Sequence, residues 1–309
     1  MSATPSPSSR LLGAVLTLLG VSFVVFMLLR WVPGDPLDAM LGENAASADR
    51  AALAAELGID RPWGEQWLRF VSGAMRLDLG RAVVGGEAVS TLVATHFART
   101  VELALVALFV AAAAGLPLGV LAAVRPRSQW AAVVAALAVV AMSLPSFVLG
   151  PLLLIVFGVW LRWLPLGGSD DPANLVLPAL TLAIPFAALL ARMTQAALAE
   201  VLGQRFVRAA RARGLREWTV VVGHGCRVAA LPVLSVAGVQ LGALLGGAVV
   251  TETVFGWPGI GQLVIEGIQR RDYPVVQGGV LAVSAAYVSV NALTDLLAQR
   301  LDPRISRSA

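Results

Sequence analysis

Long apolar segments alternate with short polar stretches along the chain. Some of them carry no charged residue over about 19 positions or more, which is close to the length that an α-helix needs to cross the hydrocarbon core of a membrane. Six segments meet this condition: Leu11–Leu29, Leu103–Val124, Ser128–Leu161, Pro172–Ala191, Val228–Thr251 and Pro274–Thr294. The pattern therefore predicts an all-α polytopic membrane protein with six transmembrane helices.

Prolines interrupt two of these segments. Pro145 and Pro151 lie within the third segment, which is too long for one straight span. Proline removes a backbone N–H donor and clashes with the preceding turn, so we expect a kink or an irregular turn there, buried against protein. Pro178 and Pro185 predict the same for the fourth segment.

The arginines of the short loops gather at one set of span ends. That set comprises Arg10, Arg125, Arg127, Arg300, Arg304, Arg307 and a cluster after the fourth span, whereas the opposite ends have Arg162, Arg270 and Arg271. Because cytoplasmic loops carry an excess of basic residues, we expect both termini and the cluster in the cytoplasm. The expected organisation is a cytoplasmic N-terminus and first span over 1–30, an extracytoplasmic loop over 31–98, a five-helix core over 99–300 and a cytoplasmic tail over 301–309.

The first loop is expected to contain two helices. Ser47 can cap a helix over 48–57 that Gly58 ends. Further on, large and small apolar residues repeat at helical spacing: Trp63, Trp67, Phe70, Val71 and Ala74. Such a face could lie on the outer membrane surface or pack against the ends of the spans, and we favour packing.

The fifth span carries glycines at every fourth position: Gly238, Gly242 and Gly246. Glycines at this spacing leave a flat stripe that another helix can approach closely. The stripe could line a dimer interface or a passage that changes width, or it could serve tight packing within one chain.

The longest polar interruption in the C-terminal half, residues 205–232, begins with a candidate amphipathic helix over 205–213. At about 100° per residue, Phe206, Val207 and Ala210 fall on one face, and Gly214 follows as a stop signal. The opposite face carries Arg205, Arg208 and Arg211. The stretch could touch anionic lipid head groups or dock a cytoplasmic protein, and its chemistry alone favours lipid.

Composition narrows the class of protein. The chain is 58% hydrophobic and 14% charged, whereas soluble domains have about 25% charged residues. The net charge of +4 does not indicate nucleic acid, because the arginines lie beside apolar spans without interleaved aromatic residues. The chain has no lysine, which a Walker-type phosphate loop requires, so it should not hydrolyse ATP by itself. Its single cysteine excludes an internal disulfide.

No pattern of catalytic or metal-binding residues stands out. His96 and His224 are far apart, and His224 with Cys226 falls short of the three or four ligands that a metal site usually takes. Glu252 and the other charged residues near the spans lie close enough to an interface to extend into water. We therefore expect no catalytic residue, metal or cofactor.

Two other classes of membrane protein are less favoured by the sequence. A stand-alone channel or secondary carrier would usually show inverted repeats or mid-membrane charges, and neither is found. An intramembrane protease or transferase would need a nucleophile–base set, which is also lacking.

The arginine-rich stretch resembles the cytoplasmic signature loop of bacterial ABC-transporter permeases, which reads E-A-A, three residues, then Gly. Here Arg208-Ala209-Ala210 precedes Arg211-Ala212-Arg213-Gly214-Leu215, and Leu231-Pro232 closes the loop. Arginine in place of glutamate and a longer spacer resemble the dipeptide/oligopeptide/nickel permease family. Further segments resemble that family along nearly the whole chain: 33–36 (PGDP), 57–62, 77–80, 251–261, 271–274 and 301–304.

The resemblance implies the permease fold of a type I ABC importer in the bacterial inner membrane. A second homologous permease would complete the pathway, and an extracytoplasmic solute-binding protein would deliver substrate. Two cytoplasmic ATPase subunits would hold ATP and Mg²⁺ and would dock on a coupling loop over 200–230. The resemblance assigns coupling to Arg208, Ala209, Ala210, Arg211, Ala212, Arg213, Gly214, Leu215, Leu231 and Pro232. Di- or oligopeptides are the expected substrates, with nickel or another small solute as the alternative.

Overall fold

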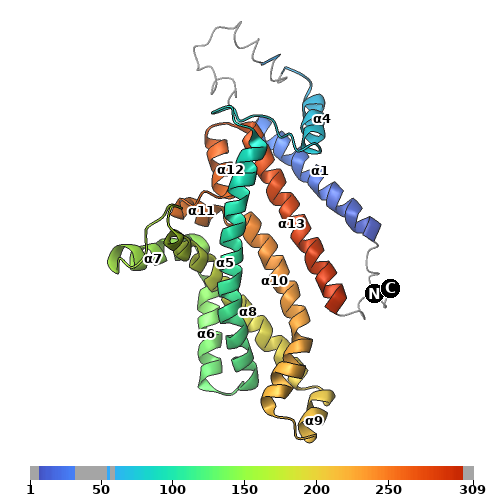
Figure 1. The fold of residues 1–309 in the computed structure, drawn as a ribbon, viewed down its shortest axis with the longest axis vertical. Coiled ribbons are helices and arrows are strands. Elements are labelled where there is room, and N and C mark those ends of the chain that lie inside the picture. Colours follow the sequence, from blue (N-terminus) through green and yellow to red (C-terminus); the bar gives the residue numbers. More distant parts are fainter. Residues whose placement is uncertain (1–6, 32–53, 56–59, 302–309) are drawn as a thin grey trace. The chain divides into compact units, whose positions relative to one another are not determined.

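The computed structural model describes residues 7–31, 54–55 and 60–301, and within them it is built from helices with one isolated β-bridge between Arg81 and Ala88. Figure 1 shows the α-helices: α1 (Pro7–Trp31), α4 (Trp63–Ala74), α5 (Val89–Val124), α6 (Gln129–Ser143), α7 (Ser146–Leu153), α8 (Val176–Leu202), α9 (Arg205–Ala212), α10 (Arg227–Gly247), α11 (Val249–Phe255), α12 (Ile260–Gln269) and α13 (Tyr273–Leu301). Two π-helices, η1 (Leu154–Trp160) and η3 (Thr219–Cys226), and a 3₁₀ turn, η2 (Pro172–Leu175), complete the described elements. The helix expected over 48–57 lies outside the described residues.

The described residues include five helical segments long and apolar enough to cross a membrane: Leu11–Trp31, Val89–Val124, Pro172–Leu202, Thr219–Gly246 and Tyr273–Arg300. Gln129–Ser143 and Ser146–Trp160 form a sixth candidate if they are counted as one span, bent by 103°. The predicted all-α, multi-spanning architecture is confirmed.

The prolines act differently in the two segments that contain them. In the third segment the chain breaks at Pro145, where ψ of 145° lies outside the helical range, so the expected irregular turn is confirmed there. Its expected burial against protein is wrong, because Pro145 is exposed. In the fourth segment no irregular turn forms, because α8 continues without a break past Pro178 and Pro185. Pro178 lies in the first turn of α8, where its missing N–H has no helical acceptor to lose, and membrane helices tolerate proline further along.

Several helices extend beyond the apolar segments that predicted them. α5 starts at Val89 instead of Leu103, and the fifth span is continuous with η3 back to Thr219. Helical backbone hydrogen bonding does not stop where charged residues begin, so apolar runs underestimate helix length. Part of the predicted outer loop, from Val89 to 98, is therefore helical.

The chain divides into two compact units, and α5 and α13 contribute to both. The first unit contains residues 101–257 together with the described part of α13 from Tyr287. Its α8 contacts α6, α7, α9, α10 and α11. The second unit contains α1, α4 and α12 with the adjoining parts of α5 and α13, and its core includes Val89, Ile260 and Val275.

Within the second unit, α4 packs on α1. The indole N–H of Trp67 donates to Ser22 Oγ at 3.2 Å, and its ring meets Phe23 edge to face with centroids 5.5 Å apart. Trp63, at the start of the stripe, stays 52% exposed. These contacts support packing of the aromatic stripe against a span.

A buried carboxylate also joins parts of the second unit. Asp272 is 3% exposed; its Oδ2 accepts the Val84 N–H at 3.1 Å, and its Oδ1 accepts the Val275 N–H at 3.3 Å. It thus caps the start of α13 and ties the backbone at Val83 and Val84 to it. Burial raises the pKa of the Asp272 carboxyl above its ordinary value, although the backbone N–H donors oppose this shift.

Candidate coupling site

The predicted amphipathic helix forms as α9, over Arg205–Ala212. Val207 is fully buried and Ala210 is 7% exposed, while Arg205, Arg208 and Arg211 are exposed. Phe206 was expected on the buried face, but it is 40% exposed. On the helical wheel it lies about 40° from Ala210, on the side away from Val207, so it falls at the edge of the buried stripe.

Gly214 ends this helix as the sequence predicts. Its φ is +79°, a left-handed conformation that glycine adopts without steric cost. The Gly214 N–H donates to Arg211 O at 2.9 Å, and the Leu215 N–H donates to Ala210 O at 3.4 Å. This pair of bonds is a Schellman motif, which turns the chain sharply while satisfying carbonyls of the last turn.

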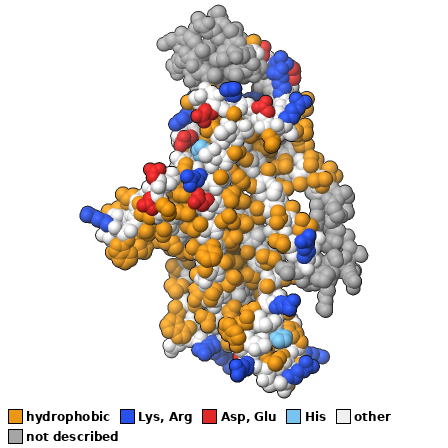
Figure 2. Space-filling model, viewed as in Figure 1, with side chains coloured by type: hydrophobic (Ala, Val, Ile, Leu, Met, Phe, Trp, Pro, Cys, Tyr) orange, Lys and Arg blue, Asp and Glu red, His pale blue; other side chains and the backbone are white. Residues whose placement is uncertain are grey.

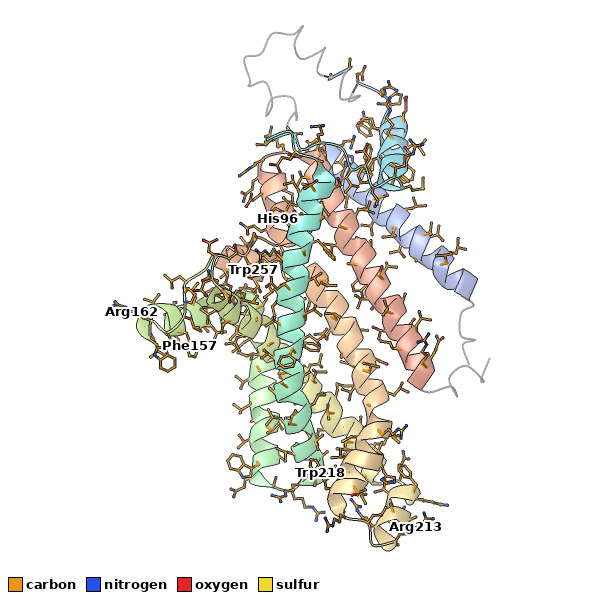
Figure 3. All side chains as sticks on the ribbon, viewed as in Figure 1. His96, Phe157, Arg162, Arg213, Trp218 and Trp257 are labelled. Carbon is orange, nitrogen blue, oxygen red and sulfur yellow. The ribbon has the colours of Figure 1, made fainter. Side chains whose placement is uncertain are left out.

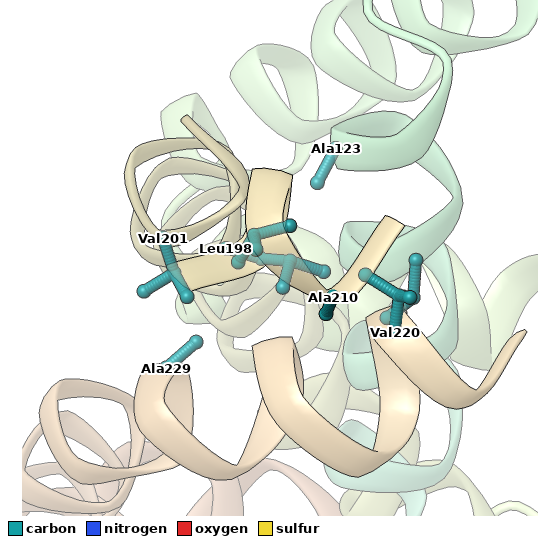
Figure 4. Packing of buried hydrophobic residues seen from close by; sticks show 8 residues of the cluster. Ala123, Leu198, Val201, Ala210, Val220 and Ala229 are labelled. Atoms are coloured by element: carbon teal, nitrogen blue, oxygen red, sulfur yellow. The ribbon is translucent and has the colours of Figure 1, made fainter. Parts of the chain in front are cut away.

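An apolar cluster beneath α9 fixes it to the neighbouring helices (Figure 4). Val207 and Ala210 pack there with Leu198 and Val201 of α8 and Val220 of η3; Ala123 of α5, Val221 of η3 and Ala229 of α10 complete the buried set. The cluster therefore packs α9 directly on α8 and on η3, which continues into α10.

The outward surface of this region is cationic. The Arg211 guanidinium holds Glu217 through two bonds, Nε–H to Oε2 at 3.1 Å and Nη2–H to Oε1 at 2.7 Å. This pair lowers the pKa of the Glu217 carboxyl and raises that of Arg211. Among the described residues, Arg205, Arg208 and Arg213 have no carboxylate partner, and Figure 3 shows Arg213 at the end of α9. The surface is therefore available for an acidic partner surface.

The remaining residues assigned to coupling by resemblance lie in two places. Ala209, Ala212 and Leu215 are exposed on or just after α9, as a contact surface for another molecule requires. Leu231 and Pro232 instead lie inside α10, beyond the cluster member Ala229, and are not part of the cluster. The structure thus brings together the helix and its glycine stop but not the closing Leu-Pro.

The predicted glycine stripe makes a close helix contact at two of its three positions. A Cβ on Gly238 would collide with the side chain of Thr294, and one on Gly242 would lie 3.1 Å from the Tyr287 ring. Both neighbours belong to α13, so α10 and α13 approach closely along this line. Gly246 is exposed. The observed contact lies within one chain.

Sequence reasoning missed a second pair of glycines. A Cβ on Gly115 or Gly119 of α5 would lie 2.5 Å from the carbonyl oxygen of Ala187 or Ala191 of α8, respectively. The same four-residue spacing that singled out the fifth span could have found this pair. It lets α8, the helix that leads into α9, pack directly on α5.

The side chain of Glu252 is buried, contrary to the expectation from the sequence. It was expected near an interface with its carboxylate in water, but it is fully buried in α11, which contacts α7 and α8. The positions of charged residues along the sequence show how far Glu252 lies from a span. They do not show that a short helix folds against its neighbours, so this burial could not be predicted.

Comparison with known proteins places this multi-pass helical protein in a family. Residues 115–307 match the family of binding-protein-dependent transport system inner membrane components, and residues 8–104 match the N-terminal domain described for such membrane components. The chain belongs to this family, and it is an inner-membrane permease subunit of an ABC importer. The family implies partnership with ATPase and binding-protein subunits.

Named relatives cover almost the whole chain. The dipeptide transport system permease protein DppB of Escherichia coli K12 is 38% identical, with 96% of this chain and 97% of DppB aligned. The glutathione transport system permease protein GsiC of Pectobacterium atrosepticum is 39% identical over the same shares. An inward-facing structure of the MetNI methionine ABC transporter shares the fold, with a TM-score of 0.55, 22% identity, and coverage of 69% of this chain and 96% of that one. The resemblance and the importer fold predicted from the motifs are confirmed.

Proposed function

We propose that this chain forms, together with a second homologous permease, the membrane pathway of an ATP-driven importer of di- and oligopeptides. The observation that carries this proposal is the full-length similarity to permeases named for dipeptide and glutathione transport. Both named substrates are short peptides, so the similarity supports a peptide substrate over nickel.

The coupling helix in this proposal is α9. Its exposed alanines permit close approach of a partner, and its arginines match an acidic groove on an ATPase subunit. Closure of two ATPase subunits would push α9, and the cluster beneath it would carry the displacement into α8 and α10. Alternating access then follows from a rigid-body shift of these spans.

The chemistry of ATP belongs to the partner subunits. The chain has no lysine for a Walker loop, so we propose that it has no ATPase activity of its own and no cofactor. ATP and Mg²⁺ would be held by the two docked ATPases, and the extracytoplasmic binding protein would select the substrate.

The orientation is part of the same proposal. With α9 in the cytoplasm, both termini lie there too, as the arginine distribution indicates. A reporter fused after Ala309 should read out as cytoplasmic; an extracytoplasmic signal would contradict the orientation and the docking role together.

Transport by the reconstituted complex tests the function. The chain would be co-purified with its second permease, ATPases and binding protein, and incorporated into proteoliposomes. We expect labelled dipeptide to accumulate only with ATP and binding protein. Accumulation of nickel but not dipeptide would reject the substrate, and uptake by this chain alone would indicate a channel or carrier instead.

A further inference from the structure

A small cleft opens where the α5–α6 hairpin turns, in a part of the protein that the coupling mechanism does not use. Its volume is about 290 Å³, close to the lower limit of about 300 Å³ for ligand pockets. Leu118, Leu121 and Val134 form its apolar wall, and Arg125, Ser128 and Trp130 lie at its polar end. We propose that this hairpin cleft binds an anionic phospholipid.

Along the hairpin, an apolar surface leads to a basic end, in the same order as the acyl chains and the head group of a phospholipid. On the α5 side of the cleft, the lining begins with the exposed Leu118 and Leu121 and ends with the guanidinium of Arg125. The backbone rises about 10 Å between Leu118 and Arg125, at 1.5 Å per residue. Trp130 is 77% exposed at the other side of the cleft, and tryptophan prefers the interface between hydrocarbon and head groups. An acyl chain can therefore lie on the leucines while its phosphate meets Arg125.

The turn holds Arg125 in place and leaves its charge free. The Ser128 hydroxyl donates to the Arg125 carbonyl at 2.8 Å and accepts the Ala131 N–H at 3.1 Å, which caps α6. These bonds occupy the serine and the backbone. Neither Arg125 nor Arg127 pairs with a carboxylate among the described residues.

The surrounding charge favours an anionic over a zwitterionic lipid. Residues 103–169 contain no aspartate or glutamate, so no nearby acid in the sequence offsets the two arginines of the turn. Figure 2 shows basic side chains at the foot of α5 and α6, below a largely apolar surface. A basic pocket between membrane helices at head-group level is the arrangement that binds anionic head groups.

Native mass spectrometry of the full-length chain in mild detergent tests the proposal. Phosphatidylglycerol and phosphatidylethanolamine with identical acyl chains would be titrated against the wild type, Arg125→Gln and the matched control Arg127→Gln, which alters the same turn outside the cleft. We expect the wild type to prefer phosphatidylglycerol. Arg125→Gln should weaken that lipid about fivefold, the effect of one arginine near an anionic surface, and Arg127→Gln less than about twofold.

Three results would overturn the proposal. Equal losses in the two variants would mean that the charge of the turn, and not the cleft, attracts lipid. Equal affinity for both lipids would exclude anionic selectivity. Displacement of phosphatidylglycerol by inorganic phosphate alone would identify a phosphate site without a role for the acyl chain. Because the readout is binding, the result is independent of the peptide-transport proposal.

Discussion

The end of α9 and the start of α13 are both charged turns, and they use their charges in opposite ways. At α9, arginines point outward, and the one ion pair of the turn, Arg211 with Glu217, is exposed. At α13, Asp272 points inward and holds two backbone N–H groups in a buried site. The inward carboxylate of Asp272 holds its own chain together, whereas the outward arginines of α9 are exposed and can meet the partner that we propose.

The pKa values of the two carboxyl groups shift in opposite directions, because one carboxylate is exposed beside an arginine and the other is buried. Hydrogen bonding to Arg211 lowers the pKa of Glu217, while desolvation raises that of Asp272. We therefore expect substitutions at the end of α9 to affect transport and substitutions at the start of α13 to affect stability.

The largest effect is expected from Gly214→Val. A β-branched residue at a φ of +79° is strained by about 1–3 kcal/mol, so the Schellman turn should open and α9 should change direction. Uptake should fall at least about tenfold with unchanged membrane insertion, measured by labelled-peptide uptake and immunoblotting of membranes. Gly223→Ala in η3, where a Cβ meets only Thr219 Cγ2 at 3.8 Å, is the control. Wild-type uptake by Gly214→Val would argue against the docking role.

Asp272→Ala should produce the opposite result, lower stability with little change in uptake per folded molecule. It removes a helix cap and leaves the Val84 N–H without its acceptor, at a cost of about 2 kcal/mol. Thermal unfolding in detergent, followed by tryptophan fluorescence, would show the lower midpoint. Asp272→Asn keeps one acceptor oxygen, so its unfolding midpoint should fall by less. An unchanged midpoint for Asp272→Ala would show that this carboxylate does not stabilise the fold.

A smaller effect separates the two faces of α9. Val207→Ala removes buried methyl groups and should cost about 1–2 kcal/mol of unfolding free energy. Phe206→Ala alters an exposed side chain and should leave the midpoint of the free chain unchanged. Equal destabilisation by both substitutions would mean that Phe206 is buried after all.

The smallest effect concerns pH at the exposed pair. Glu217 has a lowered pKa in the folded protein, so its stabilising contribution is present above the ordinary value of 4.5 and is lost as pH falls through the lowered one. The midpoint difference between wild type and Glu217→Gln should correspond to about 0.5 kcal/mol or less at neutral pH. It should shrink as the pH falls below 4.5 and disappear once the pH is below the lowered pKa of Glu217; a difference that grows on acidification would have the wrong sign.

The sequence predicted features that depend on local rules. The start and glycine stop of α9, the burial of Val207 and Ala210, and the break at Pro145 follow from periodicity and backbone chemistry. Gly238 and Gly242 marked a close helix contact, although spacing could not reveal that its partner is α13 of the same chain. Comparison with relatives then confirmed the family that the motifs indicated.

The features that escaped prediction depend on tertiary context. Glu252 is buried in α11, which packs on α7 and α8, and Asp272 is buried where Val84 meets the start of α13; a hydropathy window registers neither contact. α8 accommodates Pro185 although the residue is a helix breaker in water. Phe206 lies at the edge of the buried stripe, and a helical wheel does not show how far the neighbouring helices cover that edge.

Site-specific crosslinking of α9 to the ATPase subunits tests the central claim most directly. Cys226 would be replaced by alanine, a cysteine introduced at the exposed Ala209 and labelled with benzophenone maleimide, whose photoreactive ketone inserts into nearby C–H bonds without a partner thiol, and the assembled complex irradiated. We predict an adduct between this chain and an ATPase that is much weaker for a control cysteine at the exposed Gln129. If cysteine 209 forms no adduct with any ATPase in a complex that still transports peptide, α9 is not the coupling helix.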